Sequence, residues 1–334
     1  PVNITVSVIG GTFAAGKTVT VRLVANGLYG AYATKTISNI KVYGIPTLSY
    51  DTEKDYFNLS DTLNASLWGA SATDTFGTAL SVSVSVKESN YSAGDLVTIV
   101  ISATDITGNE AKVEIANVKV YGAPVITRDT TKNDMKTTDT VSNELFGVSA
   151  VDSFGVPLTV TTVKQSGTIS GGNTITVKSC ATDSKGNTYY ITYTVKVYGL
   201  PTIGGATKTS FKVDDTISLD TLGIIAKDSF NNRLSNVTLT LTEGVQTAGQ
   251  TLTYLVTATD HLGNVQTRTI SGIRIYGTPT ILFDTAKGSM KVTDTVNALL
   301  FSAVAKDSHN GELVVTVTVE SGTIVGGNVV KFRL

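Results

Sequence analysis

Short stretches of alternating apolar and polar residues run along the chain and predict β-strands. In residues 81–87, Val82, Val84 and Val86 alternate with polar residues, and this period of two indicates a strand with one buried face. Residues 188–198 are rich in β-branched and aromatic side chains, which favour a long strand. No segment shows a sustained helical period, so the pattern predicts an all-β chain.

Four markers recur at intervals of about 78 residues and stay in register with one another, so the chain consists of one repeated unit. The markers are Tyr-Gly-x-Pro, ending in Pro46, Pro124, Pro201 and Pro279; a glycine before a polar residue at Gly16, Gly94, Gly172, Gly249 and Gly327; an aspartate before threonine at Asp61, Asp139, Asp215 and Asp294; and a second aspartate at Asp74, Asp152, Asp228 and Asp307. The spacing predicts complete repeats at 45–122, 123–199 and 200–277. It predicts the C-terminal part of a repeat at 1–44 and the N-terminal part of another at 278–334, and hence a window onto a longer array.

About seven short strands fit into each repeat, separated by frequent turns. This arrangement predicts a tandem array of immunoglobulin-like antiparallel β-sandwiches of about 78 residues each. A large apolar residue follows the Asp-Thr pair at the same distance in each repeat, and we expect it at the centre of the sandwich. These residues are Trp68, Phe146, Leu222 and Phe301.

The composition narrows the possible functions. Of the 334 residues, 41% are hydrophobic and 16% are charged, which is typical of folded domains. The net charge of −1 provides no surplus of cations to neutralise phosphates, so we expect no nucleic-acid partner. There is no run of 18 apolar residues, so the segment contains no predicted membrane span. Cys180 is the only cysteine, which excludes a disulfide framework within this chain and a cysteine-based metal cluster.

The chain has two histidines, and the equivalent positions in the other repeats hold other residues. His261 lies in a turn, and His309 replaces a phenylalanine of the sister repeats, which suggests packing. The chain also lacks the His-Glu-x-x-His, Gly-x-Ser-x-Gly and phosphate-loop motifs. We therefore expect no enzymatic activity and no certain cofactor.

The stretches "AGDLVTIVISATDITGN" and "VKVYG", together with "SAVDSFGVPLTVTTV", resemble bacterial immunoglobulin-like surface repeats of the hyalin-repeat-like group. The resemblance covers nearly the whole chain. It implies an extracellular location, at the cell surface or in the cell wall, in adhesin stalks or surface-layer proteins. The first half repeat departs from the pattern, because "ANGLYGA" has Gly27 and Ala31 where Asp105 and Asn109 align.

The recurring acidic turns have two interpretations. Aspartate and asparagine oxygens can bind Ca²⁺, and the same residues can also accept hydrogen bonds from the backbone of their own turns. The candidate calcium ligands are Asp61, Asp74, Asp105, Asn109, Asp139, Asp152, Asp183, Asn187, Asp215, Asp228, Asp260 and Asn264.

The Tyr-Gly-x-Pro motifs mark the junctions between repeats. We expect the glycine to turn the chain with a positive φ and the proline to stiffen it. The tyrosine either packs between adjoining repeats or closes the end of its own repeat. The junction residues are Tyr43, Gly44, Pro46, Tyr121, Gly122, Pro124, Tyr198, Gly199, Pro201, Tyr276, Gly277 and Pro279.

These features predict a structural segment of a prokaryotic surface protein, acting as a rod-like stalk, a spacer or a surface-lattice element. Neighbouring repeats of the same chain are the expected partners. Two alternatives stay open. One is an adhesin module that binds a glycan or a host protein, for which Trp68 and the stretch "EKDYFN" at 53–58 are the hints. The other is a fibre subunit that self-associates by exchanging strands through its incomplete terminal repeats.

Overall fold

The computed structural model describes residues 2–334; Pro1, the first residue of the predicted 1–44 half repeat, lies outside the described residues. The predicted all-β fold class is confirmed, since the regular secondary structure is almost entirely strands, most of them paired antiparallel, with a few helical turns. No helix within 2–334 has the length and the apolar character needed to cross a membrane.

Contacts within the chain divide it into two compact units. The first contains the residues up to Lys132 together with Ser142–Val163 and Lys178–Thr192, and the second contains Asn133–Val141, Lys164–Val177 and Tyr193–Leu334. The division passes across the strands of residues 123–199, so it differs from the predicted boundaries between repeats, which stay a prediction. Each junction motif, with the partners described below, lies inside one unit.

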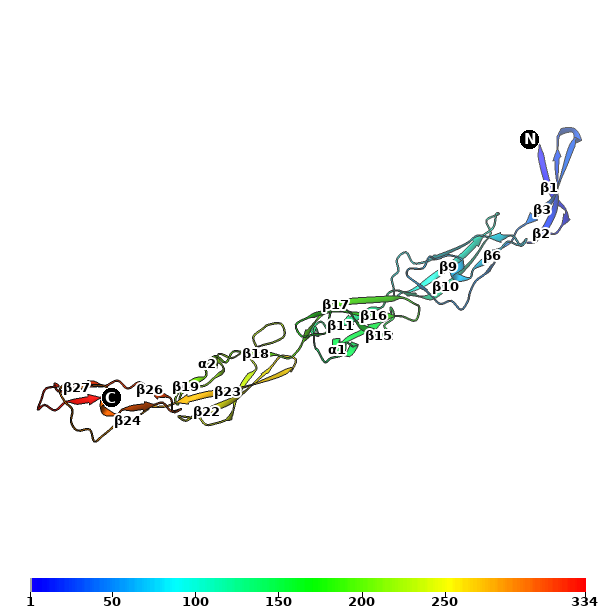
Figure 1. The fold of residues 1–334 in the computed structure, drawn as a ribbon. Helices are drawn as coiled ribbons and strands as arrows, with labels where there is room; N and C mark the ends of the chain where they lie inside the picture. Colours follow the sequence, from blue (N-terminus) through cyan, green and yellow to red (C-terminus); the bar gives the residue numbers. More distant parts are fainter. Residues whose placement is uncertain (1) are drawn as a thin grey trace. The chain divides into compact units, whose positions relative to one another are not determined.

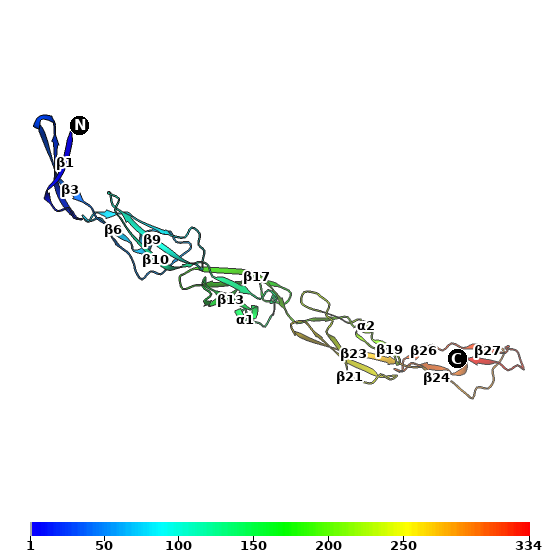
Figure 2. The same ribbon diagram turned by 180° about the vertical axis from the view of Figure 1, so that it is seen from behind.

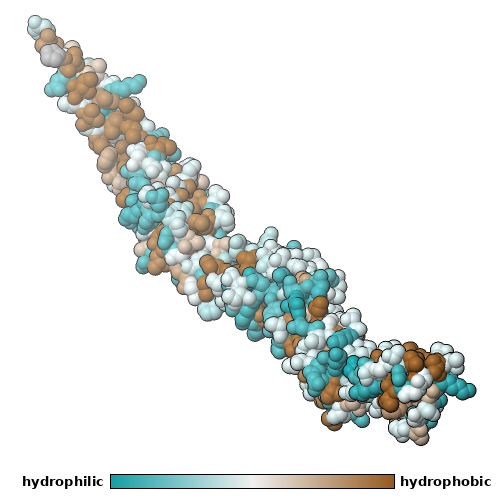
Figure 3. Space-filling model, turned by 90° about the vertical axis from the view of Figure 1, so that its left-hand side faces the viewer, coloured by the Kyte–Doolittle hydropathy of each residue, from teal (hydrophilic) through white to brown (hydrophobic). Residues whose placement is uncertain are grey.

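At the N-terminus, three strands form one antiparallel sheet (Figure 1, blue). They are β1 (Asn3–Gly11), β2 (Lys17–Asn26) and β3 (Tyr32–Val42), with the short 3-10 turn η1 (Leu28–Gly30) between the last two. Val6 pairs with Leu23, and Val8 pairs with Val21. Apolar side chains of this sheet are exposed, and they form the brown area near the upper tip of the view in Figure 3.

Residues 45–122 form a two-sheet sandwich. Its elements are β4 (Thr47–Ser49), β5 (Tyr56–Asn58), η2 (Ser66–Trp68), β6 (Ser71–Thr73), β7 (Ala79–Leu80), β8 (Val82–Val86), β9 (Leu96–Thr104) and β10 (Glu110–Tyr121). One sheet has the order β4-β6-β7 and the other β5-β10-β9-β8, and the short β5 runs parallel to the end of β10. Apolar and polar residues alternate in β8 and β9, so the apolar side chains of one sheet face lie in the core.

Trp68 lies at the centre of that core with Phe57, Ile99, Ile101 and Val118, all almost completely buried. The indole N–H of Trp68 has no hydrogen-bond partner. The equivalent Phe146 and Leu222 are also completely buried. The prediction of a buried large side chain therefore holds for these three positions, whereas Phe301 is only partly buried.

Residues 123–199 repeat the same order of elements. They are β11 (Val125–Arg128), β12 (Asp134–Lys136), α1 (Asn143–Phe146), β13 (Val148–Val151), β14 (Pro157–Leu158), β15 (Val160–Ser166), β16 (Thr174–Thr182) and β17 (Thr188–Tyr198). The sheets have the orders β11-β13-β14 and β12-β17-β16-β15, and β12 pairs in parallel with the end of β17.

The remaining residues follow a similar scheme with fewer strands. Residues 200–277 contain β18 (Thr202–Gly204), β19 (Ser210–Lys212), α2 (Leu219–Leu222), β20 (Ile225–Lys227), β21 (Val237–Glu243), β22 (Thr251–Thr259) and β23 (Val265–Tyr276). Residues 278–334 contain β24 (Thr280–Leu282), η3 (Leu299–Phe301), β25 (Val304–Lys306), β26 (Glu312–Leu313), β27 (Thr318–Ser321) and β28 (Lys331–Arg333). Figure 2 shows β21, β23 and α2 from behind, with β24 to β27 in orange and red.

One-turn helices hold the large core residues. In α1, the Ser142 side chain accepts a hydrogen bond from the Leu145 N–H, and Gly147 ends the helix in the left-handed conformation. In α2, Ser218 and Thr221 form a capping box. Each helix is too short to show a helical period in the sequence, and each ends on the buried residue that it positions, Phe146 or Leu222.

Candidate functional site

The junction glycines share one hydrogen bond that crosses from one predicted repeat to the next. In every copy, the glycine N–H donates to a hydroxyl that directly follows the second recurring aspartate. The four bonds join Gly44 to Thr75 at 3.4 Å, Gly122 to Ser153 at 2.9 Å, Gly199 to Ser229 at 2.8 Å and Gly277 to Ser308 at 2.8 Å. The end of one repeat is thereby attached to a turn of the following one.

The expectation of a positive φ at the junction glycines was wrong, because none of the four adopts one. They are required for space instead. A Cβ on Gly122 would lie 2.6 Å from the Cβ of Ala93, and Gly44 and Gly277 face Ala15 and Ala248 in the same way at 2.5 and 2.6 Å. Gly199 faces Gly171, whose Cα would lie 3.2 Å from the added Cβ.

A second glycine brings another backbone segment to the same place. Gly94 has a φ of +94°, and a Cβ on it would lie 2.7 Å from the Ser153 carbonyl oxygen. Its N–H donates to the Val120 carbonyl at 2.8 Å. Gly172 and Gly249 repeat both features at the later junctions. The recurring Gly-polar marker is therefore part of the junction.

The junction tyrosines pack against an aromatic ring of the following repeat. The ring centroids are 5.1 Å apart for Tyr43 and Phe76, 5.0 Å for Tyr121 and Phe154, 4.8 Å for Tyr198 and Phe230, and 4.8 Å for Tyr276 and His309. Tyr121 and Tyr198 are buried. The junction prolines Pro46, Pro124 and Pro201 are buried as well, while Pro279 is exposed. Each junction tyrosine thus contacts the next repeat, and Tyr121 also packs against Tyr56 of its own repeat.

The second junction, which contains Tyr121, receives a further turn of the following repeat. The Lys185 ammonium lies 3.9 Å from the centre of the Tyr56 ring and 5.5 Å from that of Tyr121. The Asn187 side-chain N–H donates to the Asn58 side-chain oxygen at 2.8 Å. Cation–π and amide contacts therefore supplement the shared hydrogen bond.

The third junction, which contains Tyr198, has a histidine in the turn equivalent to that of Lys185 and Asn187. His261 packs edge-on against Tyr198 with ring centroids 4.5 Å apart, and its Nε2 lies 2.9 Å from Oδ2 of Asp134. Burial raises the pKa of the Tyr198 hydroxyl, and the carboxylates of Asp134, Asp228 and Asp260 raise it further. These carboxylates give the third junction an acidic surrounding.

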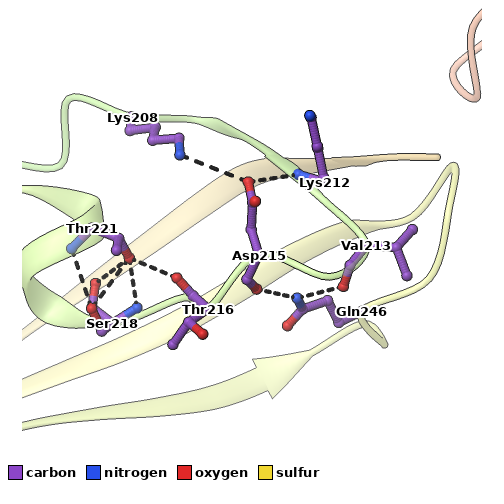
Figure 4. A network of polar contacts seen from close by, with 8 residues as sticks. All are labelled: Lys208, Lys212, Val213, Asp215, Thr216, Ser218, Thr221 and Gln246. Carbon is purple, nitrogen blue, oxygen red and sulfur yellow. Dashed lines mark hydrogen bonds and ion pairs between the residues drawn. The ribbon is translucent and has the colours of Figure 1, made fainter.

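The candidate calcium aspartates, together with Asp294 and Asp307 at the equivalent positions in residues 278–334, form two kinds of turn. In the first, a carboxylate oxygen accepts the backbone N–H of the residue three positions before it. This bond measures 2.8 Å at Asp61, 2.7 Å at Asp139, 2.9 Å at Asp215 and 2.7 Å at Asp294. At Asp215, the Lys208 ammonium lies 3.8 Å from the same oxygen, and the Gln246 amide bonds to the carbonyls of Val213 and Asp215 (Figure 4).

In the second kind, one carboxylate oxygen accepts two backbone N–H groups, from residues two and four positions later. The residues are Asp74, Asp105, Asp152, Asp183, Asp228, Asp260 and Asp307. The amides of Asn109, Asn187 and Asn264 donate to the second oxygen of Asp105, Asp183 and Asp260. Burial opposes the charge of Asp105, but the hydrogen bonds from Asn109 and Thr107 prevail and lower its pKa to about 2.

These contacts support the interpretation of the acidic turns as backbone caps. Among residues 2–334, the structure brings together no group of three or more His, Cys, Asp or Glu side chains suited to a metal ion. Calcium binding stays a prediction.

The hydroxyl partners were not predicted from the sequence; they are Thr75, Ser153, Ser229 and Ser308. The signal was present, because a small hydroxyl residue follows the second aspartate in every repeat. The stretch considered for a ligand is used in packing: Phe57 and Trp68 are buried, and Tyr56 packs against Tyr121 with ring centroids 5.9 Å apart.

No protein-family model matches the chain, and no curated protein matches it. Solved structures with some likeness include the M60 catalytic domain with two CBM51 domains of ZmpB from Clostridium perfringens, at 12% identity and a TM-score of 0.22 over 93% of this chain and 36% of that one. The protocadherin gamma-B4 extracellular domain matches at 12% identity and a TM-score of 0.22 over 91% of this chain and 63% of that one. Immunoglobulin domains 1–5 of Sidekick-1 match at 10% identity and a TM-score of 0.26 over 83% of this chain and 74% of that one. The chain thus spans less than two thirds of the first two structures.

Proposed function

We propose that the chain is a structural segment of an extracellular repeat protein, in which each junction restrains two neighbouring repeats and the segment serves as a stalk or spacer. The observation that carries this proposal is the junction itself. In four copies, the same glycine N–H meets a hydroxyl of the following repeat, and the same tyrosine packs on an aromatic ring there.

The physical basis is the absence of a flexible linker. At the second junction, Tyr121 and Gly122 both contact the following repeat, and Pro124 is already buried. Proline fixes its own φ and holds its predecessor in an extended conformation, so few backbone torsions stay free between Tyr121 and Pro124. Repeats of this size have small cores and gain stability from contacts with their neighbours.

Small-angle scattering and pulsed electron spin resonance on the full chain test the proposal. We expect an elongated particle and narrow distributions of the distance between spin labels placed on either side of a junction. A broad distribution at every junction, or a compact globular particle, would contradict it. A lattice or cell-wall role, and the location of the protein outside the cell, belong to the proposal and need localisation of the intact protein.

The adhesin alternative receives no support from the described side chains, because the aromatic residues considered for a ligand are engaged in the core and the second junction. A glycan array with the full chain tests it directly. The strand-exchange alternative also stays a prediction, and sedimentation at high concentration tests it.

A further inference from the structure

Both histidines of the chain lie at junctions and pack on junction tyrosines. His261 contacts Tyr198, and His309 contacts Tyr276. Histidine is the side chain whose charge ordinarily changes between pH 5 and 8. The first two junctions have Phe76 and Phe154 at the place of His309, and neither has a histidine contact.

The two histidines differ in their hydrogen-bond partners. His261 Nε2 faces a carboxylate, Oδ2 of Asp134 on β12, at 2.9 Å. His309 Nε2 faces the Ile275 carbonyl oxygen at 3.1 Å. Protonation of His261 adds a positive charge opposite the Asp134 carboxylate and makes an ion pair across the junction. His309 Nε2–H donates to a neutral carbonyl, so its protonation makes no ion pair there.

Several charged groups lie near His261. Asp134 and Lys136 come from β12, Asp228 from the turn that bears Ser229, and Asp260 is the adjacent residue in its own turn. Lys136 is the opposing cation, with its ammonium 3.9 Å from the place of a Cβ on Gly263. The His261 charge contributes to lowering the pKa of Asp228, after the hydrogen bonds from Asn232 and Phe230 have overcome the effect of burial. Three carboxylates and the ammonium groups of Lys136 and Lys196 therefore lie around the third junction, and of the carboxylates Asp134 bonds directly to His261.

We propose that the third junction is pH-responsive, and that protonation of His261 tightens the contact between residues 133–199 and 200–277 through Asp134. This inference rests on the proposed function, because it describes the regulation of one junction. The effect has the size of an exposed ion pair, since the side chains of His261 and Asp134 are 50% and 33% exposed. Its sign follows from the added attraction: the contact is strongest at pH 5 and weakens as the pH rises towards 8.

The test uses the full chain with Cys180→Ser and spin labels introduced at Gln165→Cys and Thr240→Cys, two exposed positions on β15 and β21. In addition, hydrogen exchange of the Gly199 amide, which donates to Ser229, reports opening of the junction. We expect the protection of this amide, corrected for the intrinsic effect of pH, to be about two- to fivefold greater at pH 5 than at pH 8. The distance distribution narrows over the same range.

Three variants assign the effect. His261→Gln keeps a polar side chain that does not titrate, and Asp134→Asn removes the charged partner, so each abolishes the pH dependence. His309→Gln is the matched control and leaves it unchanged. A pH dependence that persists in His261→Gln overturns the inference. Narrow distributions that are equal at both pH values also overturn it but leave the proposed function intact, whereas broad distributions at both pH values, found at the other junctions too, contradict the proposed function as well.

Discussion

The second and third junctions share a set of contacts, here called the frame, and differ in the contacts around it. Both contain the Gly-to-Ser hydrogen bond and the tyrosine on a phenylalanine, through Gly122 and Tyr121 in one and Gly199 and Tyr198 in the other. Around this frame, the second junction has Lys185 over two tyrosine rings, whereas the third has His261 beside Asp134. The frame is common to both junctions, and we expect the side chains around it to give each junction its own response to salt and pH.

The two junctions differ in the residue that faces the junction glycine, which is Ala93 in the second and Gly171 in the third. This difference gives the largest predicted loss of stability. Gly122→Ala places a Cβ 2.6 Å from the Ala93 Cβ, whereas Gly199→Ala meets the Gly171 Cα at 3.2 Å. Because overpacking of this severity costs about 1–3 kcal/mol, we expect Gly122→Ala to destabilise its junction more than Gly199→Ala. Hydrogen exchange of the two junction amides measures both. Gly326→Ala is the control, since a Cβ there meets nothing within 4 Å; equal losses in all three variants would show that space is not the reason for these glycines.

The shared hydrogen bond should contribute equally to both junctions. Ser153→Ala and Ser229→Ala each remove the acceptor of a junction N–H, and each should cost about 1 kcal/mol in the local opening free energy. Thr75→Ala should cost less, because the Gly44 bond is long at 3.4 Å. A much larger loss at one of the two serines would break the equivalence of the two frames.

The acidic turns predict a pH dependence that is separate from that of His261. The pKa of Asp105 is lowered to about 2 from an ordinary value of 3.8. Its charged form is therefore favoured in the folded state, and the stabilisation is present above about pH 4 and is lost as the pH falls through 2. An NMR titration of the carboxyl should give a midpoint near 2, and Thr107→Val should raise it by removing the hydroxyl that donates to Oδ1 at 2.8 Å. A midpoint near 3.8 would show that these hydrogen bonds do not form in solution.

The contacts outside the frame should give smaller effects. Lys185→Gln removes the cation over Tyr56 and Tyr121 and should weaken the second junction by about 0.5–1 kcal/mol. We expect added salt to reduce this difference only in part, because the ring attracts the ammonium through its quadrupole. The third junction at pH 8 is the comparison: its amide protection should be unaffected by Lys185→Gln.

The fold class predicted from the sequence is confirmed, the boundaries between repeats stay a prediction, and the reason for the junction residues was not foreseen. Alternation in residues 81–87 and the regular spacing of Tyr-Gly-x-Pro were sufficient to predict sandwiches in series. The positive φ expected at Gly122 was wrong, because the constraint comes from Ala93, nearly thirty residues away in the chain, which no local rule reveals. Ser153 was overlooked because a serine in a turn has an ordinary local explanation, and its partner Gly122 becomes its neighbour only in the folded chain.

The smallest effect should come from removing calcium, which tests the acidic turns and not the junctions. Each aspartate of the Asp105 kind already accepts two backbone N–H groups on one oxygen, and at Asp105, Asp183 and Asp260 an asparagine amide occupies the other. An ion would have to displace these donors, so we expect the melting temperature to be the same in 1 mM Ca²⁺ and in EDTA. A site with a dissociation constant one hundredth of the calcium concentration would instead stabilise its repeat by about 2.7 kcal/mol. For a domain of this size such stabilisation would raise the melting temperature by well over 4 °C. A shift of that size that disappears in Asp105→Asn would show that the Asp105 turn binds an ion.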